Sequence, residues 1–244
     1  MKILGIESAS VTASAAVLAD DVLLAEYTTN YKKTHSETLL PMIDEILTMT
    51  GTSPKELSMI AVSEGPGSFT GLRIGAAAAK GLAKALEIPI IPVPTLDAIA
   101  YQLAGSACLL CPLMDARRGE VYAGLYAFQG TELVVHQKAE ALPITEQVRR
   151  AEALSAETGK PVMYLGDGMP VFEERIRTLT EGRALFAPAN VRNQKAGSVA
   201  ALGKLLYERG VVSDAVNFLP FYLRKSQAEQ EREAMGLGTE PASL

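Results

Sequence analysis

The spacing of hydrophobic and polar positions along the chain predicts an alternation of strands and helices. Short apolar runs bounded by polar or glycine turns indicate strands, and apolar side chains recurring every three or four residues indicate helices. In the first part of the chain this pattern predicts strands at 2–7, 13–19 and 22–28, a helix at 36–50, a strand at 59–64, a helix at 72–87, a strand at 89–93 and a helix at 95–103.

The second part of the chain begins with the same pattern. Three strands are predicted again, and the first strand of each half ends in an acid, Glu7 in one and Asp115 in the other. A repeat of this kind indicates an internal duplication of structure. The predicted elements are strands at 109–115, 120–128 and 132–137, a helix at 144–154, a strand at 162–165, a glycine turn at 166–168, and helices at 171–179 and 196–209.

Two halves of this kind predict a two-lobed α/β fold with a ligand cleft between the lobes. We expect an N-terminal lobe at 1–104, a C-terminal lobe at 105–219 and a partly flexible tail at 220–244, with a hinge near Gly105. The actin, sugar-kinase and Hsp70 ATPase superfamily has this organisation, and its acid-bearing turns approach nucleotide phosphates. The residues expected to face a nucleotide or another anion are Glu7, Ser8, Ser10, Ser68, Thr70, Arg73, Asp115, Gly166, Asp167 and Gly168.

The stretch at 62–75 combines a strand end, a tight Gly65-Pro66-Gly67 loop and a helix N-terminus. Backbone N–H groups and the positive end of the helix dipole meet there, which suits an anion. The stretch lacks the Lys-Ser or Lys-Thr of a P-loop, and Thr70 stands where a dinucleotide fingerprint needs glycine. A plain strand-to-helix turn therefore remains an alternative, and Arg73 could pair with an acid of the chain or with a ligand phosphate.

The following helix carries very small side chains at four-residue intervals: Gly71, Gly75, Ala79 and Ala83. Glycine inside a helix costs roughly 1 kcal/mol relative to alanine. Such a ridge indicates that a second backbone approaches closely. That backbone belongs either to the protein's own sheet or to a helix of another chain.

Composition narrows the class of protein. The 244 residues are 48% hydrophobic and 21% charged, which is typical of a globular chain, and the net charge is −5. That charge argues against a protein that grips nucleic acid by itself. The sequence contains neither a membrane-spanning run of roughly 18 apolar residues nor a signal peptide at its N-terminus, so we expect a cytoplasmic protein.

Few residues in the chain could carry metal or nucleophilic chemistry. Cys108 and Cys111 form a C-x-x-C pair, but they lie in a predicted buried strand and no second pair completes a zinc site. We predict that both are core residues. The only histidines are His35 and His136. These residues support neither a metal site nor a nucleophile set, and we expect no catalytic residue and no metal ligand.

Several strings resemble the bacterial TsaB (YeaZ) family: Ile6-Glu7-Ser8, the run at 35–41, Gly65 to Gly75, and Pro220-x-Tyr222-Leu223-Arg224. The resemblance implies a non-catalytic, activating subunit of the machinery that makes threonylcarbamoyladenosine at tRNA position 37. It implies a catalytic partner, TsaD, and an ATPase, TsaE. It also implies a homodimer when the chain is alone, contact with tRNA only through the complex, and ATP or ADP only in the complex with TsaD and TsaE.

In this family, helices of the first lobe pair with their equivalents on the partner. The interface residues that the resemblance implies are His35, Leu40, Asp44, Leu47, Gly71, Leu72, Gly75, Ala76, Ala79 and Ala83. The catalytic relative carries a His-x-x-x-His metal pair, and the matching places here are Thr95 and Ile99, neither of which binds a transition metal well.

Two other functions remain as alternatives. A stand-alone small-molecule kinase of the same superfamily needs two phosphate turns, and the turn at 7–10 lacks the glycine that lets phosphate approach. A metal-dependent peptidase of the glycoprotease type needs more ligands than two histidines supply.

Overall fold

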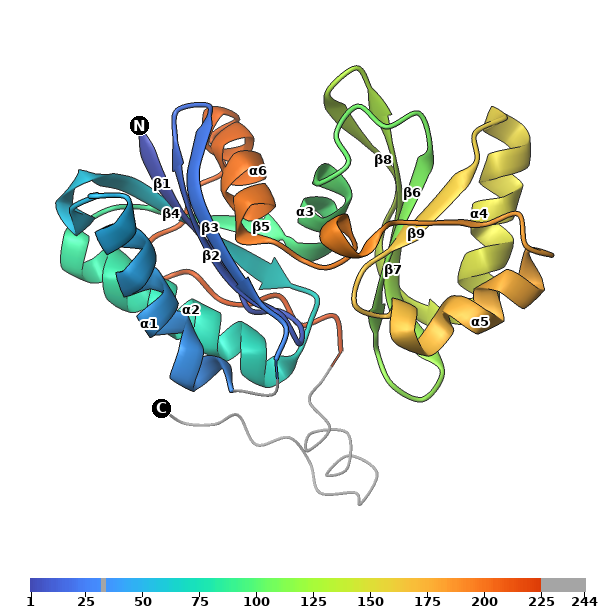
Figure 1. Cartoon of the computed structure of the whole chain (residues 1–244), viewed down its shortest axis with the longest axis horizontal. Coiled ribbons are helices and arrows are strands. Elements are labelled where there is room, and N and C mark those ends of the chain that lie inside the picture. The colour runs from blue at the N-terminus through green and yellow to red at the C-terminus, as the bar shows by residue number, and fades with distance from the viewer. Residues whose placement is uncertain (32–33, 225–244) are drawn as a thin grey trace.

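Two five-stranded mixed sheets organise the chain, whose computed structural model describes residues 1–31 and 34–224 (Figure 1). The first sheet has the order β3-β2-β1-β4-β5. The central strand β1 pairs antiparallel with β2 and parallel with β4, which in turn pairs parallel with β5. The strands span β1 Lys2–Glu7, β2 Ala13–Ala19, β3 Val22–Thr29, β4 Leu57–Gly65 and β5 Ile90–Pro94.

The second sheet repeats this topology in the order β8-β7-β6-β9-β10. Its central strand β6 pairs antiparallel with β7 and parallel with β9. The strands span β6 Leu109–Asp115, β7 Glu120–Gln129, β8 Glu132–Pro143, β9 Val162–Leu165 and β10 Leu185–Phe186. The matching order confirms the predicted duplication and the two-lobed α/β fold. The short strand β10 was not predicted, and β8 is longer than expected because its pairing with β7 continues as far as Pro143.

Helices cover the sheets on both faces (Figure 1). Helices α1 and α2 lie side by side and pack on the first sheet, whereas α6 packs on the opposite face together with α3. In the second lobe, α4 and α5 contact each other and their sheet. The helices span α1 His35–Met49, α2 Phe69–Leu86, α3 Thr95–Tyr101, α4 Ile144–Thr158, α5 Met169–Leu179 and α6 Ala196–Glu208, with 3-10 turns at Pro54–Glu56 and Ala189–Val191.

Helix α6 belongs to the first lobe, although we expected it inside a second lobe spanning 105–219. Two side chains of the first sheet accept hydrogen bonds from its first N–H groups. The Ala196 N–H donates to Ser14 Oγ at 3.1 Å, and the Gly197 N–H donates to Glu26 Oε1 at 2.7 Å. A carboxylate at the positive end of the helix dipole is favourable. After α6, Ser213 forms a bridge with Ile90 of β5, so the chain continues on the first lobe.

The two lobes share an apolar cluster around α3. Leu96 and Ile99 of α3 pack with Leu110 and Met114 of β6, all of them almost fully buried. The hydroxyl of Tyr126 on β7 donates a hydrogen bond of 2.8 Å to Asp97. This contact fixes the two lobes together on the side of the cleft where the chain crosses between them.

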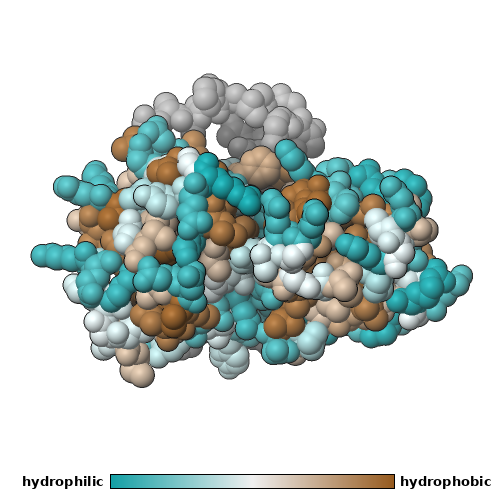
Figure 2. Space-filling model, turned by 90° about the horizontal axis from the view of Figure 1, so that it is seen from above, coloured by the Kyte–Doolittle hydropathy of each residue, from teal (hydrophilic) through white to brown (hydrophobic). Residues whose placement is uncertain are grey.

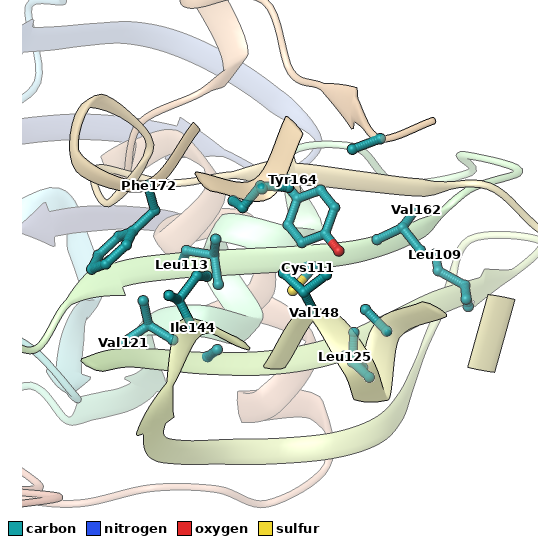
Figure 3. Packing of buried hydrophobic residues seen from close by; sticks show 14 of the residues in the cluster. Leu109, Cys111, Leu113, Val121, Leu125, Ile144, Val148, Val162, Tyr164 and Phe172 are labelled. Carbon is teal, nitrogen blue, oxygen red and sulfur yellow. The ribbon is translucent and has the colours of Figure 1, made fainter. Parts of the chain in front are cut away.

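The second lobe has its own core, in which Cys111 lies among apolar side chains from β6, β7, β9 and α4 (Figure 3). Burial raises the pKa of the Cys111 thiol to about 12, and Gln147 Nε2 donates a hydrogen bond of 3.3 Å to the sulfur atom. Cys111 is therefore a core residue as predicted. Cys108 is only partly buried.

The small-residue ridge of α2 faces the protein's own first lobe, which corrects its expected role as a partner surface. A Cβ atom at Gly71 would lie 2.1 Å from the Ser8 carbonyl oxygen, and one at Gly75 would lie 2.2 Å from Ser8 Oγ. The other ridge residues are also buried, as is Leu47 of α1. The interface residues that the fold places inside are Leu47, Gly71, Leu72, Gly75, Ala76, Ala79 and Ala83.

A different stripe of α2 faces outward, and we call it the outer ridge. Its exposed members are Thr70, Arg73, Ala77, Gly81 and Lys84.

The surface of the molecule seen from above is mixed in character, with hydrophobic patches scattered among hydrophilic side chains (Figure 2). Within the described ranges, no helix has the length and apolar character needed to cross a membrane.

The two kinds of glycine in α2 predict opposite effects of alanine. Gly71→Ala should lower the free energy of unfolding by about 1–3 kcal/mol, because its Cβ would overlap a backbone carbonyl. Gly81→Ala should raise it by about 0.5–1 kcal/mol, because no atom of the described part of the chain lies within 4 Å of the new Cβ and alanine favours the helix. Urea unfolding of both variants tests this, and equal effects would contradict the assigned faces.

Candidate functional site

A cleft of about 1200 Å³ lies between the lobes. Its walls come from segments far apart in the sequence: the turn after β1, the chain leading into α1, the loop before α2, the turn after β6, the start of α5 and the segment at 222–224. The lining residues are Ala9, Ser10, Val11, Asn30, Tyr31, Thr34, His35, Ser36, Gly67, Ser68, Phe69, Thr70, Gly71, Ile74, Met114, Asp115, Ala116, Arg117, Arg118, Tyr122, Asp167, Pro170, Val171, Tyr222, Leu223 and Arg224.

Glu7 ends β1 beneath the cleft and is fully buried. One carboxylate oxygen accepts a hydrogen bond of 2.6 Å from the Ala9 N–H, and the other accepts a short bond from the Ser63 hydroxyl. Burial raises the pKa of Glu7 to about 7 although both hydrogen bonds lower it, and the charge of Asp167 from the other lobe raises it further. Glu7 thus uses its oxygens to hold the turn and the neighbouring strand.

The turn after β1 is held directly against the glycine loop before α2. The Ser68 N–H donates to the Ala9 carbonyl at 2.6 Å, and the Ser8 hydroxyl donates to the Gly71 carbonyl at 2.9 Å. A Cβ atom at Gly67 would lie 2.3 Å from the Ala9 oxygen. Since not even a methyl group fits there, no phosphate fits between this turn and the start of α2. The open volume of the cleft lies outside the contact between this turn and the glycine loop.

The turn after β6 forms the opposite wall of the cleft. Asp115 accepts a hydrogen bond of 2.8 Å from the Arg117 N–H and pairs with the Arg117 guanidinium at 3.2 Å. Arg117 and Arg118 both have a left-handed backbone, with φ of 68° and 56°. This geometry is uncommon for residues with a Cβ atom and turns both arginines to the cleft lining.

Asp167 follows β9 and contributes a second carboxylate to this wall. Gln194 Nε2 donates a hydrogen bond of 2.8 Å to Asp167 Oδ1. Burial raises the pKa of Asp167 to about 6, and the nearby Asp115 adds to the rise. The turn itself is close to β6, because the Gly168 N–H donates to the Leu113 carbonyl at 3.0 Å.

The structure brings together only part of the predicted anion-facing set. Ser10, Ser68, Thr70, Asp115 and Asp167 line the cleft. The remaining members lie outside the lining: Glu7 and Ser8 beneath the first turn, Gly166 and Gly168 against β6, and Arg73 on the outer ridge of α2.

Arg73 has partners that the sequence did not indicate. Its guanidinium carbon lies 3.9 Å from the centre of the Phe69 ring, and its Nε donates a hydrogen bond of 3.3 Å to the Tyr222 hydroxyl. Within the described residues Arg73 forms no ion pair with an acid of the chain, so that expected pairing is not found.

Sequence reasoning missed several lining residues, among them Tyr31, Arg117, Arg118, Tyr122 and the segment at 222–224. The two arginines directly follow the acid Asp115, which was a usable signal. The Tyr222-Leu223-Arg224 string was noticed only through the family resemblance. His35 also lines the cleft, where its Nε2 donates to the Ser10 carbonyl at 2.6 Å.

The positions corresponding to the relative's metal pair are inside the fold. Thr95 and Ile99 have exposed fractions of 0% and 1%. Among residues 1–31 and 34–224, no three His, Cys, Asp or Glu side chains converge as a metal site.

Comparison with known proteins identifies relatives over most of the chain. The family model described as TsaD, tRNA N6-adenosine threonylcarbamoyltransferase, matches residues 22–232. The tRNA threonylcarbamoyladenosine biosynthesis protein TsaB of Bacillus subtilis is 34% identical over 231 residues, which cover 94% of this chain and 96% of the relative. TsaB of Escherichia coli is 37% identical over 161 residues, covering 64% of this chain and 69% of the relative.

A solved structure shows the same fold. YeaZ from Pseudomonas aeruginosa superposes with a TM-score of 0.75 at 25% sequence identity, covering 91% of this chain and 99% of that one. A second Pseudomonas aeruginosa structure, described as similar to peptidase YEAZ, gives a TM-score of 0.73 at 24% identity, covering 91% and 99%.

The raised pKa of Glu7 predicts a pH-dependent stability. Because the folded pKa of about 7 exceeds the unfolded value, the folded state binds more protons between roughly pH 4.5 and 7, and stability falls as pH rises through this window. Glu7→Gln should remove that fall, which is on the order of 3 kcal/mol. Unfolding measured from pH 5 to 8 checks this, with the exposed Glu157→Gln as control. A parallel pH profile in wild type and Glu7→Gln would contradict the assignment.

Proposed function

Because the chain belongs to the TsaB family of tRNA threonylcarbamoyladenosine biosynthesis proteins, we propose that it is a non-catalytic subunit that binds and activates TsaD. The observation that carries the proposal is the match to a TsaB protein over nearly the full length of both chains. In this proposal TsaE joins the complex, ATP or ADP enters only with TsaD and TsaE, and tRNA is reached through the complex in the cytoplasm. The free chain forms a homodimer.

The carboxylates around the cleft support a subunit without catalysis of its own. Glu7 is bonded to Ser63 and Ala9, Asp115 to Arg117, and Asp167 to Gln194. A general acid or base needs free access to a proton on the substrate. Each of these carboxylates instead holds a neighbouring part of the fold, and no phosphate fits between the first turn and the start of α2.

The outer faces of α1 and α2 support the docking of TsaD. Leu40 is 54% exposed on α1, and Asp44 is exposed one turn later. On α2, Ala77 and Gly81 form an exposed surface of small side chains. Among residues 1–31 and 34–224, nothing lies within 4 Å of a Cβ position at Gly81, so none of these residues explains its cost of roughly 1 kcal/mol in the helix. Close approach of a partner helix provides an explanation.

The proposed docking surface therefore consists of exposed residues next to the buried small-residue ridge of α2. Leu40 and Asp44 stay in the proposed interface, and Thr70, Ala77, Gly81 and the exposed part of Arg73 take the place of the buried glycines and alanines. A helix pair with small side chains lets the partner's helices pack at short distance, as close-packed interfaces require.

Reconstitution tests the proposed role directly. The purified chain alone should modify no tRNA when supplied with threonine, bicarbonate and ATP. Adding it to TsaD, TsaE and the adenylate-forming enzyme should increase the initial rate of threonylcarbamoyladenosine formation by at least about tenfold, which corresponds to about 1.4 kcal/mol in activation free energy. An equal rate without the chain would overturn the proposal, and phosphoryl transfer or peptide cleavage by the chain alone would favour the kinase or the peptidase.

Substitutions on the outer faces test the docking surface. Gly81→Gln and Leu40→Asp should each weaken TsaD binding by at least about tenfold, because exposed sites accept the new side chains in the free chain but not in a packed interface. Calorimetry measures the affinity and thermal melting monitors the fold. Val135→Asp is the control, since Val135 is an exposed apolar residue of the second lobe. Wild-type affinity in both helix variants would place the interface elsewhere.

A further inference from the structure

The segment at 220–224 runs from the first lobe towards the second (Figure 1). Before it, Phe218 is buried in the core of the first lobe, and Lys80 of α2 donates to the Phe218 carbonyl at 3.0 Å. The Phe221 N–H then donates to the Glu64 carbonyl at 2.6 Å. A Cβ atom at Gly65 would lie 2.1 Å from the Phe221 oxygen, so the segment lies directly on the loop before α2.

Tyr222 attaches the segment to the first turn of α2. Its ring lies 4.7 Å from that of Phe69, measured between centres, and its hydroxyl accepts the hydrogen bond from Arg73. Arg73 also stacks on Phe69, so three side chains form one aromatic and cationic cluster. Arg73 belongs to the outer ridge one helical turn before Ala77, and this cluster therefore borders the proposed docking surface.

Arg224 attaches the same segment to the second lobe. Its Nη1 donates to the Ala116 carbonyl at 3.3 Å, and its Nη2 pairs with Glu120. Ala116 and Glu120 flank the arginine turn that forms one wall of the cleft. The guanidinium fork bonds two groups of this turn at once, a geometry that lysine does not reproduce.

The lobes are thus connected on two sides by contacts of different strength. The buried apolar cluster around α3 holds one side. On the other side, Arg224 forms an ion pair with Glu120 in which both side chains are 29% exposed. A partly exposed ion pair is much weaker than buried apolar packing, so the Arg224 contact is the one that opens first.

We propose that Phe221–Arg224 is a strap that couples a partner on α2 to the angle between the lobes. This inference rests on the proposed docking of TsaD. A partner covering the Phe69, Arg73 and Tyr222 cluster excludes water from it and holds Tyr222 in place. Tyr222 then keeps Arg224 on the second lobe. Because coupling between two equilibria is reciprocal, loss of the Arg224 contact should weaken partner binding although Arg224 lies across the cleft from the docking surface.

Distance measurements between the lobes test the strap in the full chain. Spin labels at Lys55→Cys and Glu174→Cys, in a Cys108→Ser background, report the separation of the lobes by electron–electron dipolar spectroscopy, since both labelled positions are exposed. Arg224→Gln should broaden the distance distribution of the free chain. Arg183→Gln, which breaks an exposed ion pair within the second lobe, should not. The double variant Arg224→Glu/Glu120→Arg should recover part of the narrow distribution.

Repeating the measurement with TsaD present tests whether the strap is coupled to docking. The partner should narrow the distribution of the wild-type chain, and Arg224→Gln should bind TsaD about 5-fold or more weakly, within the usual range of coupling. Equal distributions in wild type and Arg224→Gln without TsaD would overturn the strap. Equal affinities would overturn its coupling to the partner. If wild type fails to bind TsaD, the proposed function fails, and the measurement on the free chain still decides whether Arg224 holds the lobes.

Discussion

The structure depends on the close contact between the turn after β1 and the start of α2. Three glycines, Gly67, Gly71 and Gly75, allow this contact because each has an atom of Ser8 or Ala9 where its Cβ would be. The contact has two consequences. It leaves no room for a phosphate between the first turn and the start of α2, and it fixes the rotation of α2 so that Ala77 and Gly81 face outward. The filled space beside the first turn and the outward-facing small residues of α2 therefore have the same structural cause.

The duplicated lobe shows what is particular to the first one. The glycine turn of the second lobe also lies against the central strand of its sheet, since a Cβ atom at Gly166 would lie 2.2 Å from the Leu113 oxygen. Its helices, however, carry long charged side chains in ion pairs, such as Glu173 with Arg177 on α5 and Glu146 with Arg149 on α4. Burying such side chains costs both desolvation and conformational entropy. Although the two lobes share a topology, the exposed stripe of α2 has the adjacent small residues Ala77 and Gly81 at its centre, and neither forms an ion pair.

The sequence predicted the elements well because strands and helices are set by local periodicity. It did not predict which lobe holds α6, since the groups that cap that helix, Ser14 and Glu26, lie far away along the chain. The ridge of α2 shows a second limit. Small residues at 71, 75, 79 and 83 reveal that some backbone comes close, but composition does not tell whose backbone it is. The tertiary fold answers that question for these four positions, whereas no contact within the described residues accounts for the glycine at the exposed position 81.

The residues of the cleft show the same limit of prediction from sequence. Acids at strand ends were predictable, and Asp115 and Asp167 do line the cleft. The partner of Asp115 is near in the sequence, because Arg117 follows two residues later, but the hydrogen bond from Gln194 to Asp167 is one that no spacing encodes. The carboxylates of this cleft are hydrogen-bonded within the fold, which agrees with the proposed non-catalytic role. The unequal connections of the two lobes, apolar at α3 and polar at Arg224, make one side of that cleft the hinge and the other its adjustable edge.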